Sequence, residues 1–376
     1  MFNFFCSQFL SYSVTYLVVL IQFQGWMTYS YKSFPFAYTV FVAITQIVLT
    51  VWNWEHLMSA LNKLSQSATY ETILLSSLVL VQVPSFLVGI YSWFFEVPSI
   101  VKCYNMSAAI EKRILDLFST SSITTRMMNF WTALFGLDLV ISMVFGSFII
   151  YGSFLYTHSF AILFMFNFTR SHLASLHSCY VFTFSRDLAR KLREIMIKNE
   201  EFQHHKLKIC HNLWMEIWSV SQGHASSLAI TLLVQIMSNL LFFITSSYGM
   251  IVLIKVGDIQ QIIELIPYFF FAIFNVVLIC ESAQHAQDEL GDTFLRTLMG
   301  MDKHSMSHES IEEVNNFMNT IAYTDKAKIT LKNYINIGRP LLVTLLSTSV
   351  TYLVVLLQFH SSAIDVQMSS DNTTAP

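Results

Sequence analysis

The stretch SVTYLVVLLQF, residues 349–359, lies near the end of a longer apolar segment that covers residues 340–361. A helix needs roughly 20 mostly apolar residues to cross the hydrocarbon core of a bilayer, so this segment predicts a transmembrane helix. Gln358 places a hydrogen-bonding amide in that helix, and an amide facing lipid would lack partners. Gln358 is therefore expected to face protein or water.

Seven further apolar stretches have the length of a membrane span. Hydrophobic residues make up 54% of the 376 and charged residues only 12%, which is about half of what a soluble domain carries. The net charge of −3 gives no sign of nucleic-acid binding. The chain is predicted to be an all-α polytopic membrane protein, with the other stretches near residues 6–25, 33–54, 72–95, 130–155, 159–183, 227–254 and 262–283.

The basic residues predict the orientation of these spans. Together with Lys32, the segments 96–129, 184–226 and 284–339 hold 18 of the 21 Lys and Arg residues, and basic loops stay cytoplasmic. With the first stretch set aside, seven spans start from a cytoplasmic N-terminus and leave the C-terminus outside the cell. A G-protein-coupled receptor has the opposite orientation.

Helical patterns also continue beyond the expected membrane spans. Apolar residues recur three and four apart through residues 207–219 and 282–317, which predicts cytoplasmic helices packed together. The seven-helix domain is assigned to residues 32–361, with cytoplasmic helices of an anchor region within 284–339. Residues 362–376 are expected to form a short extracellular tail.

An internal repeat marks the first apolar stretch. Residues 13–23 read SVTYLVVLIQF and agree with residues 349–359 at ten of eleven positions. Residues 1–31 are interpreted as an extra segment from a mispredicted gene model, with the true start near or after Met27. The rival interpretation is a real eighth span with the N-terminus outside.

The motif from Thr351 to Phe359 resembles the signature TYhhhhhQF, with h hydrophobic, that closes the last helix of insect gustatory receptors. Residues 314–317 and 336–340 resemble the same family. The resemblance implies a ligand-gated, non-selective cation channel in the plasma membrane of gustatory sensory neurons. It also implies a homo- or hetero-tetramer with other gustatory receptors, in which the last helix of each subunit lines the pore, and no cofactor, metal or catalytic residue.

Two residues of the motif are expected at the narrowest part of this pore, Gln358 and Val355. Thr351 lies seven residues before Gln358, so both share one helix face, while Tyr352 and Phe359 form a neighbouring face that packs. Four Gln amides favour cations with little discrimination, and a ring of Val355 can close the path by dewetting. The alternative is that Gln358 only bonds across a helix interface.

A small organic ligand is expected to bind among aromatic and polar groups in the outer halves of the spans. Sugar-sensing members of the family often carry Glu directly after Thr-Tyr, whereas this chain has Leu353, so a bitter or plant-derived tastant is favoured. The competing interpretation is that these side chains pack the bundle or anchor it at the membrane interface. The candidates are Tyr151, Tyr156, His158, Phe160, Arg170, Tyr248 and Tyr268.

Asp138 and Arg170 are charges inside expected spans, where an unpaired charge is costly. They lie at matching depth on either side of the turn expected near 156–158. The two residues are interpreted as a buried ion pair, with ligand binding by Arg170 as the alternative.

Three other protein classes fit the sequence less well. A receptor that signals through G proteins also has seven spans, but the charge bias opposes it and no Asp-Arg-Tyr sequence follows the third span. A transporter is expected to show two related halves, and only the eleven-residue repeat recurs here. The cytoplasmic histidines show no catalytic or metal-ligand spacing, so an enzyme is not expected.

Overall fold

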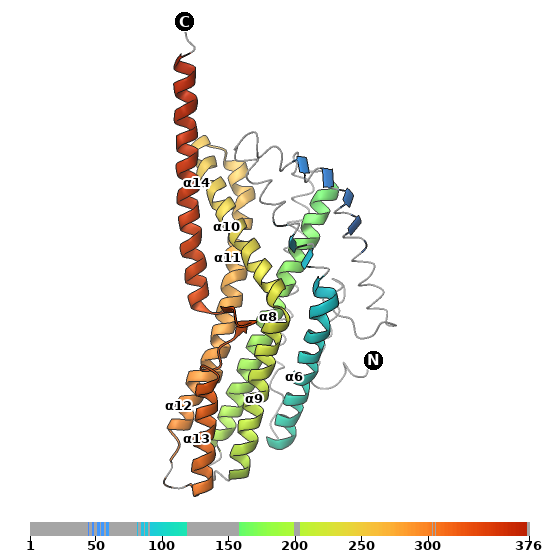
Figure 1. The fold of residues 1–376 in the computed structure, drawn as a ribbon, viewed down its shortest axis with the longest axis vertical. Helices are drawn as coiled ribbons and strands as arrows, with labels where there is room; N and C mark the ends of the chain where they lie inside the picture. Colours follow the sequence, from blue (N-terminus) through green and yellow to red (C-terminus); the bar gives the residue numbers. More distant parts are fainter. Residues whose placement is uncertain are drawn as a thin grey trace.

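The part of the chain that the structure describes is almost entirely helical. The computed structural model describes separate helical positions between 44 and 91 and then residues 92–118, 158–198, 204–302, 304 and 306–373. Within these ranges, the side chains of 158–173, of 359–373 and of a few other positions lie outside the description. The predicted all-α class is confirmed, and Figure 1 shows long helices that run along the longest axis.

The four longest of the described helices have 28 to 41 residues and exceed the thickness of the hydrocarbon core of a bilayer. The longest, α8, has 41 residues. At a rise of about 1.5 Å per residue it is about 60 Å long, roughly twice the thickness of the hydrocarbon core. It therefore extends outside the membrane, well past the expected end of its span at residue 183. The four are α8 (His158–Lys198), α10 (Ala229–Val256), α11 (Ile259–Asp288) and α14 (Arg339–Thr373).

Among the described residues, three helices are long and apolar enough to cross a membrane, namely Ala229–Val256, Phe269–Met299 and Arg339–Gln358. They correspond to the last three spans expected from the sequence. The spans expected at 6–25 and 130–155 lie outside the described residues, and those at 33–54 and 72–95 lie mostly outside. Between α10 and α11 the chain turns at Gly257, whose φ of 80° is open to glycine and whose N–H donates to the carbonyl of Leu253.

The helices predicted to extend beyond the membrane form a second bundle at the lower end of Figure 1. It consists of α6 (Val97–Phe118), the lower half of α8, α9 (His204–Ser227), the π-helical segment η2 (Glu289–Thr293), α12 (Phe294–Met299) and α13 (His308–Tyr323). The pattern over 282–317 is not one helix, because α12 ends at Gly300 and α13 begins after Ser307. The Ser307 Oγ accepts a hydrogen bond of 3.2 Å from the N–H of Ser310 and so caps α13.

Aromatic side chains fill the core of this lower bundle. Trp214 of α9 is fully buried, and its indole N–H donates to the carbonyl of Leu290 in η2 at 2.9 Å. The ring of Phe317 from α13 lies 5.6 Å from Trp214 and 5.3 Å from Phe294 of α12. This hydrogen bond ties α9 to the π-helical turn η2.

A short hairpin connects α13 to α14. Its strands β1 (Thr330–Leu331) and β2 (Ile335–Asn336) pair antiparallel, and the N–H of Tyr334 donates to the carbonyl of Leu331. Lys332 and Asn333 have φ of 47° and 63°, as a type I′ turn requires. The Gln222 side chain of α9 donates to the Thr330 carbonyl at 3.1 Å and accepts from its N–H at 3.0 Å, which ties the hairpin to the bundle.

Candidate functional site

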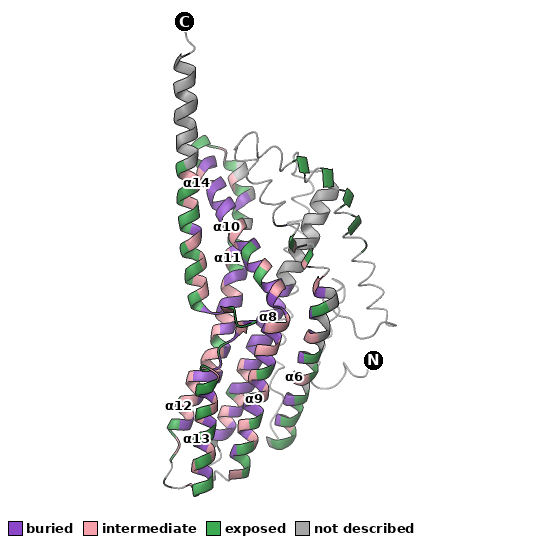
Figure 2. Ribbon diagram, viewed as in Figure 1, coloured by how far each residue is buried: buried purple, intermediate pink, exposed green. Residues whose placement is uncertain are grey.

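The last helix, α14, is the least buried of the three candidate spans. Only 6% of its most apolar window is buried inside the protomer, against 50% for α10. Figure 2 shows α14 along the edge of the molecule with mostly exposed residues over its described length. A transmembrane helix with this surface has lipid or other chains as its neighbours.

One face of α14 is polar and points away from the rest of the protomer. Ser349 packs inward with 1% exposure, and Gln358 lies nine residues later, which is about two and a half turns and therefore the opposite side. Thr351 lies about two turns before Gln358 and shares its face. Ser347 and Thr344 lie about one and two turns before Thr351, and all four are exposed. These residues, Thr344, Ser347, Thr351 and Gln358, are called the polar stripe.

The hydroxyl groups of the polar stripe are accommodated by the helix itself. The Thr351 Oγ1 donates to the carbonyl of Ser347 at 3.0 Å, and the Thr344 Oγ1 donates to that of Pro340 at 2.9 Å. Such bonds to the preceding turn satisfy the hydroxyl donor inside a membrane helix. The stripe can therefore face either water or another subunit without an unpaired hydroxyl.

Valines flank the polar stripe. Val354 and Val355 lie on its two sides with exposures of 47% and 38%, so the sequence-predicted gate residue stands at the edge of the stripe. Tyr352 is predicted to pack against a neighbour, and its side chain is 57% exposed in the protomer. Its packing against another subunit therefore stays a prediction. The side chain of Phe359 lies outside the described residues.

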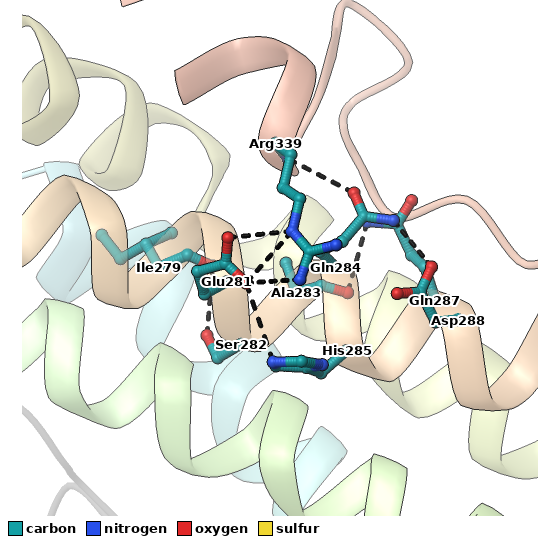
Figure 3. A network of polar contacts seen from close by, with 9 residues as sticks. All are labelled: Ile279, Glu281, Ser282, Ala283, Gln284, His285, Gln287, Asp288 and Arg339. Atoms are coloured by element: carbon teal, nitrogen blue, oxygen red, sulfur yellow. Dashed lines mark hydrogen bonds and ion pairs between the residues drawn. The ribbon is translucent and has the colours of Figure 1, made fainter. Parts of the chain in front are cut away.

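Three side chains of α11 hold the base of α14, and Figure 3 shows two of them, Glu281 and Gln284, in contact with Arg339. Glu281 accepts two hydrogen bonds of 2.9 Å, one from Nε and one from Nη2 of Arg339. The Gln284 amide oxygen accepts from the main-chain N–H of Arg339 at 3.3 Å. The Gln287 amide donates to the carbonyl of Ile337 at 2.5 Å. The sequence analysis gave these residues no role, although Arg339 directly precedes the last span.

The predicted ligand residues are described only in part. Tyr248 of α10 is buried with 2% exposure, facing the helix bundle rather than lipid. His158, Phe160 and Arg170 lie in α8 and Tyr268 in α11, but their side chains are outside the description. The whole of Tyr151, Tyr156 and Asp138 lies outside it, so the expected ion pair and pocket stay predictions.

The sequence was also compared with known families and proteins. The model of a family described as 7tm chemosensory receptor matches residues 28–362. The chain belongs to this family. The resemblance seen in the motif at residues 351–359 is thereby confirmed.

Two curated mosquito proteins are relatives of this chemosensory receptor. It is 25% identical over 345 residues to Gustatory and odorant receptor 22 of Anopheles gambiae, and the match covers 88% of this chain and 71% of that protein. It is 29% identical over 161 residues to Gustatory and odorant receptor 24 of the same species, covering 43% of this chain and 35% of the relative.

The fold of the chemosensory receptor resembles a solved insect receptor. The olfactory receptor OR5 from Machilis hrabei matches with a TM-score of 0.60 at 11% identity, covering 92% of this chain and 97% of that one. The same receptor in complex with eugenol matches with a TM-score of 0.55 at 11% identity over the same shares. These likenesses show a shared fold, and they confirm the all-α polytopic membrane architecture.

Proposed function

We propose that this chemosensory receptor is a subunit of a ligand-gated, non-selective cation channel for small tastants in the plasma membrane of gustatory sensory neurons. Four copies, identical or combined with other gustatory receptors, surround one pore lined by α14. The observation that carries the proposal is the polar stripe. It faces away from the described core of its own protomer on a membrane-spanning helix, and lipid is a poor environment for a row of polar side chains. A shared axis of four such helices supplies water instead.

The pore residues of the proposal are Thr351, Val355 and Gln358. Four Gln358 side chains place neutral amide oxygens around the axis, which favours cations without selecting one. Val355 lies at the edge of the polar stripe, where a small rotation of α14 moves an apolar side chain into the path. Tyr352 and Phe359 belong to the neighbouring face and pack against the adjacent subunit.

The ligand of the proposal is a small organic molecule bound in the outer part of each subunit, separate from the pore. The buried Tyr248 supports an aromatic lining there, and the solved relative in complex with eugenol supports the size class. Because Leu353 replaces the Glu of sugar-sensing members, we infer a bitter or plant-derived compound. In the same proposal, Asp138 and Arg170 pair and hold the third and fourth spans together.

Voltage clamp of oocytes that express the full chain tests the proposal. The ligand panel is caffeine, quinine, sucrose and fructose. We expect a ligand-evoked cation current that Gln358→Glu raises and Gln358→Lys lowers, because a ring of charge in a pore attracts or repels cations. The matched controls are Asn319→Asp and Asn319→Lys, at an exposed position of α13. Both are expected to leave ion permeation unchanged.

The main alternative function is signalling through G proteins without a pore. A response that is abolished by G-protein inhibition and is indifferent to both Gln358 variants contradicts the channel. The position of the C-terminus gives a second discrimination, because the channel architecture places it outside the cell. An epitope at the C-terminus is then labelled by antibody on intact cells.

A further inference from the structure

Within the protomer, α14 packs along α10 and is hydrogen-bonded at its base to α11. Among its described side chains Ser349 is the one that is buried, while Leu341, Leu342 and Leu345 are half-buried against the central core. The side chains of the polar stripe and of its flanking valines are exposed in the described part of the chain. The hydrogen bonds that join described residues of α11 to the start of α14 lie at residues 337–339, where they can set the angle of α14 relative to its own subunit.

Two of the α11 side chains that hold this base, Glu281 and Gln284, share one helix face with Asp288. Glu281, Gln284 and Asp288 are spaced three and four residues apart, and the Gln284 amide donates to the Asp288 carboxylate at 2.8 Å. Gln284 thus has its amide oxygen turned toward the main chain of Arg339. Figure 3 shows Glu281 beside the Arg339 guanidinium on this same side of α11.

The contacts of the base divide into two kinds. Gln284 and Gln287 bind main-chain atoms of residues 337–339 and so fix where the helix starts. Glu281 binds the Arg339 side chain through its two oxygens, and the Nη2 of Arg339 lies 2.9 Å from the Glu281 Oε2. A two-point contact fixes an orientation as well as a distance.

The ion pair is weak enough to open during gating. The side chains of Arg339 and Glu281 are 54% and 33% exposed, and exposed pairs contribute little because water and salt screen them. Meanwhile α11 packs its Ala272, Ile279 and Ala283 into the helix bundle with at most 1% exposure, so it moves with that bundle. A shift of α11 on ligand binding therefore reaches α14 through this contact.

We propose that the ion pair between Glu281 and Arg339 is a latch that sets the position of the base of α14 and thereby the balance between the closed and open channel. The latch rests on the channel function proposed above. Glu281 and Arg339 are positioning residues, because they act on the pore through α14 and do not line it.

The test compares single variants with a charge swap. Glu281→Gln and Arg339→Gln are each expected to change the half-maximal ligand concentration about fivefold, with the ion permeability ratios unchanged. The double variant Glu281→Arg with Arg339→Glu is expected to restore the wild-type value. A merely structural role predicts lower current at an unchanged half-maximal concentration.

A second ion pair supplies the matched control. Arg113 of α6 and Glu216 of α9 lie 2.8 Å apart with exposures of 53% and 34%, close to those of the latch, but they join two helices of the lower bundle. Arg113→Gln and Glu216→Gln are expected to leave ligand sensitivity unchanged. An equal shift in these controls overturns the latch.

Hydrogen exchange of the purified full-length chain in nanodiscs gives a readout that needs no current. Exchange of the main-chain amides at 337–345 is expected to rise in each single variant of the latch and to return to the wild-type rate in the swap. Unchanged exchange overturns the latch even where the channel conducts. A wild-type chain that conducts no current with any ligand of the panel or any partner subunit contradicts the channel function, while the exchange rates still decide whether the pair holds α14.

Discussion

The carboxylate of Glu96 accepts hydrogen bonds from both the main-chain N–H and the hydroxyl of Thr231. Glu96 ends the π-helical segment η1 (Ser92–Glu96), and Thr231 lies in the first turn of α10. The residue before α10, Leu228, has no side chain that can cap the helix. Glu96 takes that role from a separate helix and places a negative charge at the positive end of α10.

Loss of this cap is expected to destabilise the protein. Glu96→Ala removes the acceptor for the first turn of α10 and is expected to lower the free energy of unfolding by about 1–2 kcal/mol. Glu96→Gln keeps an acceptor oxygen and is expected to cost less. Thermal melting of the detergent-purified chain measures both. Equal melting temperatures for Glu96→Ala and the wild type contradict the capping role.

Two glycines of the lower bundle, Gly291 and Gly300, give a contrast between a very close approach and ordinary van der Waals contact. A Cβ at Gly291 would lie 2.2 Å from the main-chain oxygen of Lys326, whereas at Gly300 the nearest atom is 3.4 Å away. Gly291→Ala is therefore expected to destabilise the bundle by about 1–3 kcal/mol, because the main chain at Lys326 would have to move to make room for the added methyl group. Gly300→Ala is the matched control and is expected to be tolerated. Size-exclusion profiles and melting temperatures of the two variants decide between these outcomes.

The buried imidazole of His224 makes stability depend on pH. Burial in α9 lowers its pKa to about 3, and its ring lies 4.9 Å from that of His177 and 5.9 Å from that of Phe182. The neutral form is favoured in the folded state, so its contribution is fully present above pH 6.5 and is lost as the pH falls toward 3. Between pH 6.5 and 5.5 the loss is about 1 kcal/mol.

A variant separates His224 from the other titrating groups. Both ring nitrogens of His224 lack a hydrogen-bond partner among the described residues, so His224→Phe removes the titration without breaking a bond. The melting temperature of this variant is expected to fall less than that of the wild type between pH 6.5 and 5.5. Parallel curves for the two proteins would exclude His224 as the source of the acid sensitivity.

Much of the architecture follows from the sequence because lipid imposes a simple rule. Any stretch of about 20 apolar residues must be a helix, and the stretch at 340–361 was found in this way. Its helix continues to Thr373, past the expected end of the span. The family also follows from the sequence, because the motif at 351–359 has fixed spacing.

The sequence does not predict the features that depend on which helix faces pack against each other. Ser349 and Ser347 are chemically alike, and only the packing of α14 shows that the first is buried and the second belongs to the polar stripe. Glu281 and Arg339 are 58 positions apart, and no local pattern links them. The break between α12 and α13 was missed because the apolar spacing over 282–317 continues across Gly300, while the cap at Ser307 is a single residue.

Val354 and Val355 provide the last and most direct prediction about the gate. They are identical side chains on opposite edges of the polar stripe, with exposures of 47% and 38%. If Val355 closes the pore by dewetting, Val355→Ala widens and wets the constriction, and the ligand-free current is expected to rise about fivefold or more. Val354→Ala removes the same atoms from the other edge and is expected to leave the ligand-free current near the wild-type value. Voltage clamp with surface labelling, so that currents are compared per receptor, measures the difference. A larger effect at Val354 places the gate on the other edge of the stripe, and no effect at either valine means that the constriction is formed elsewhere on α14.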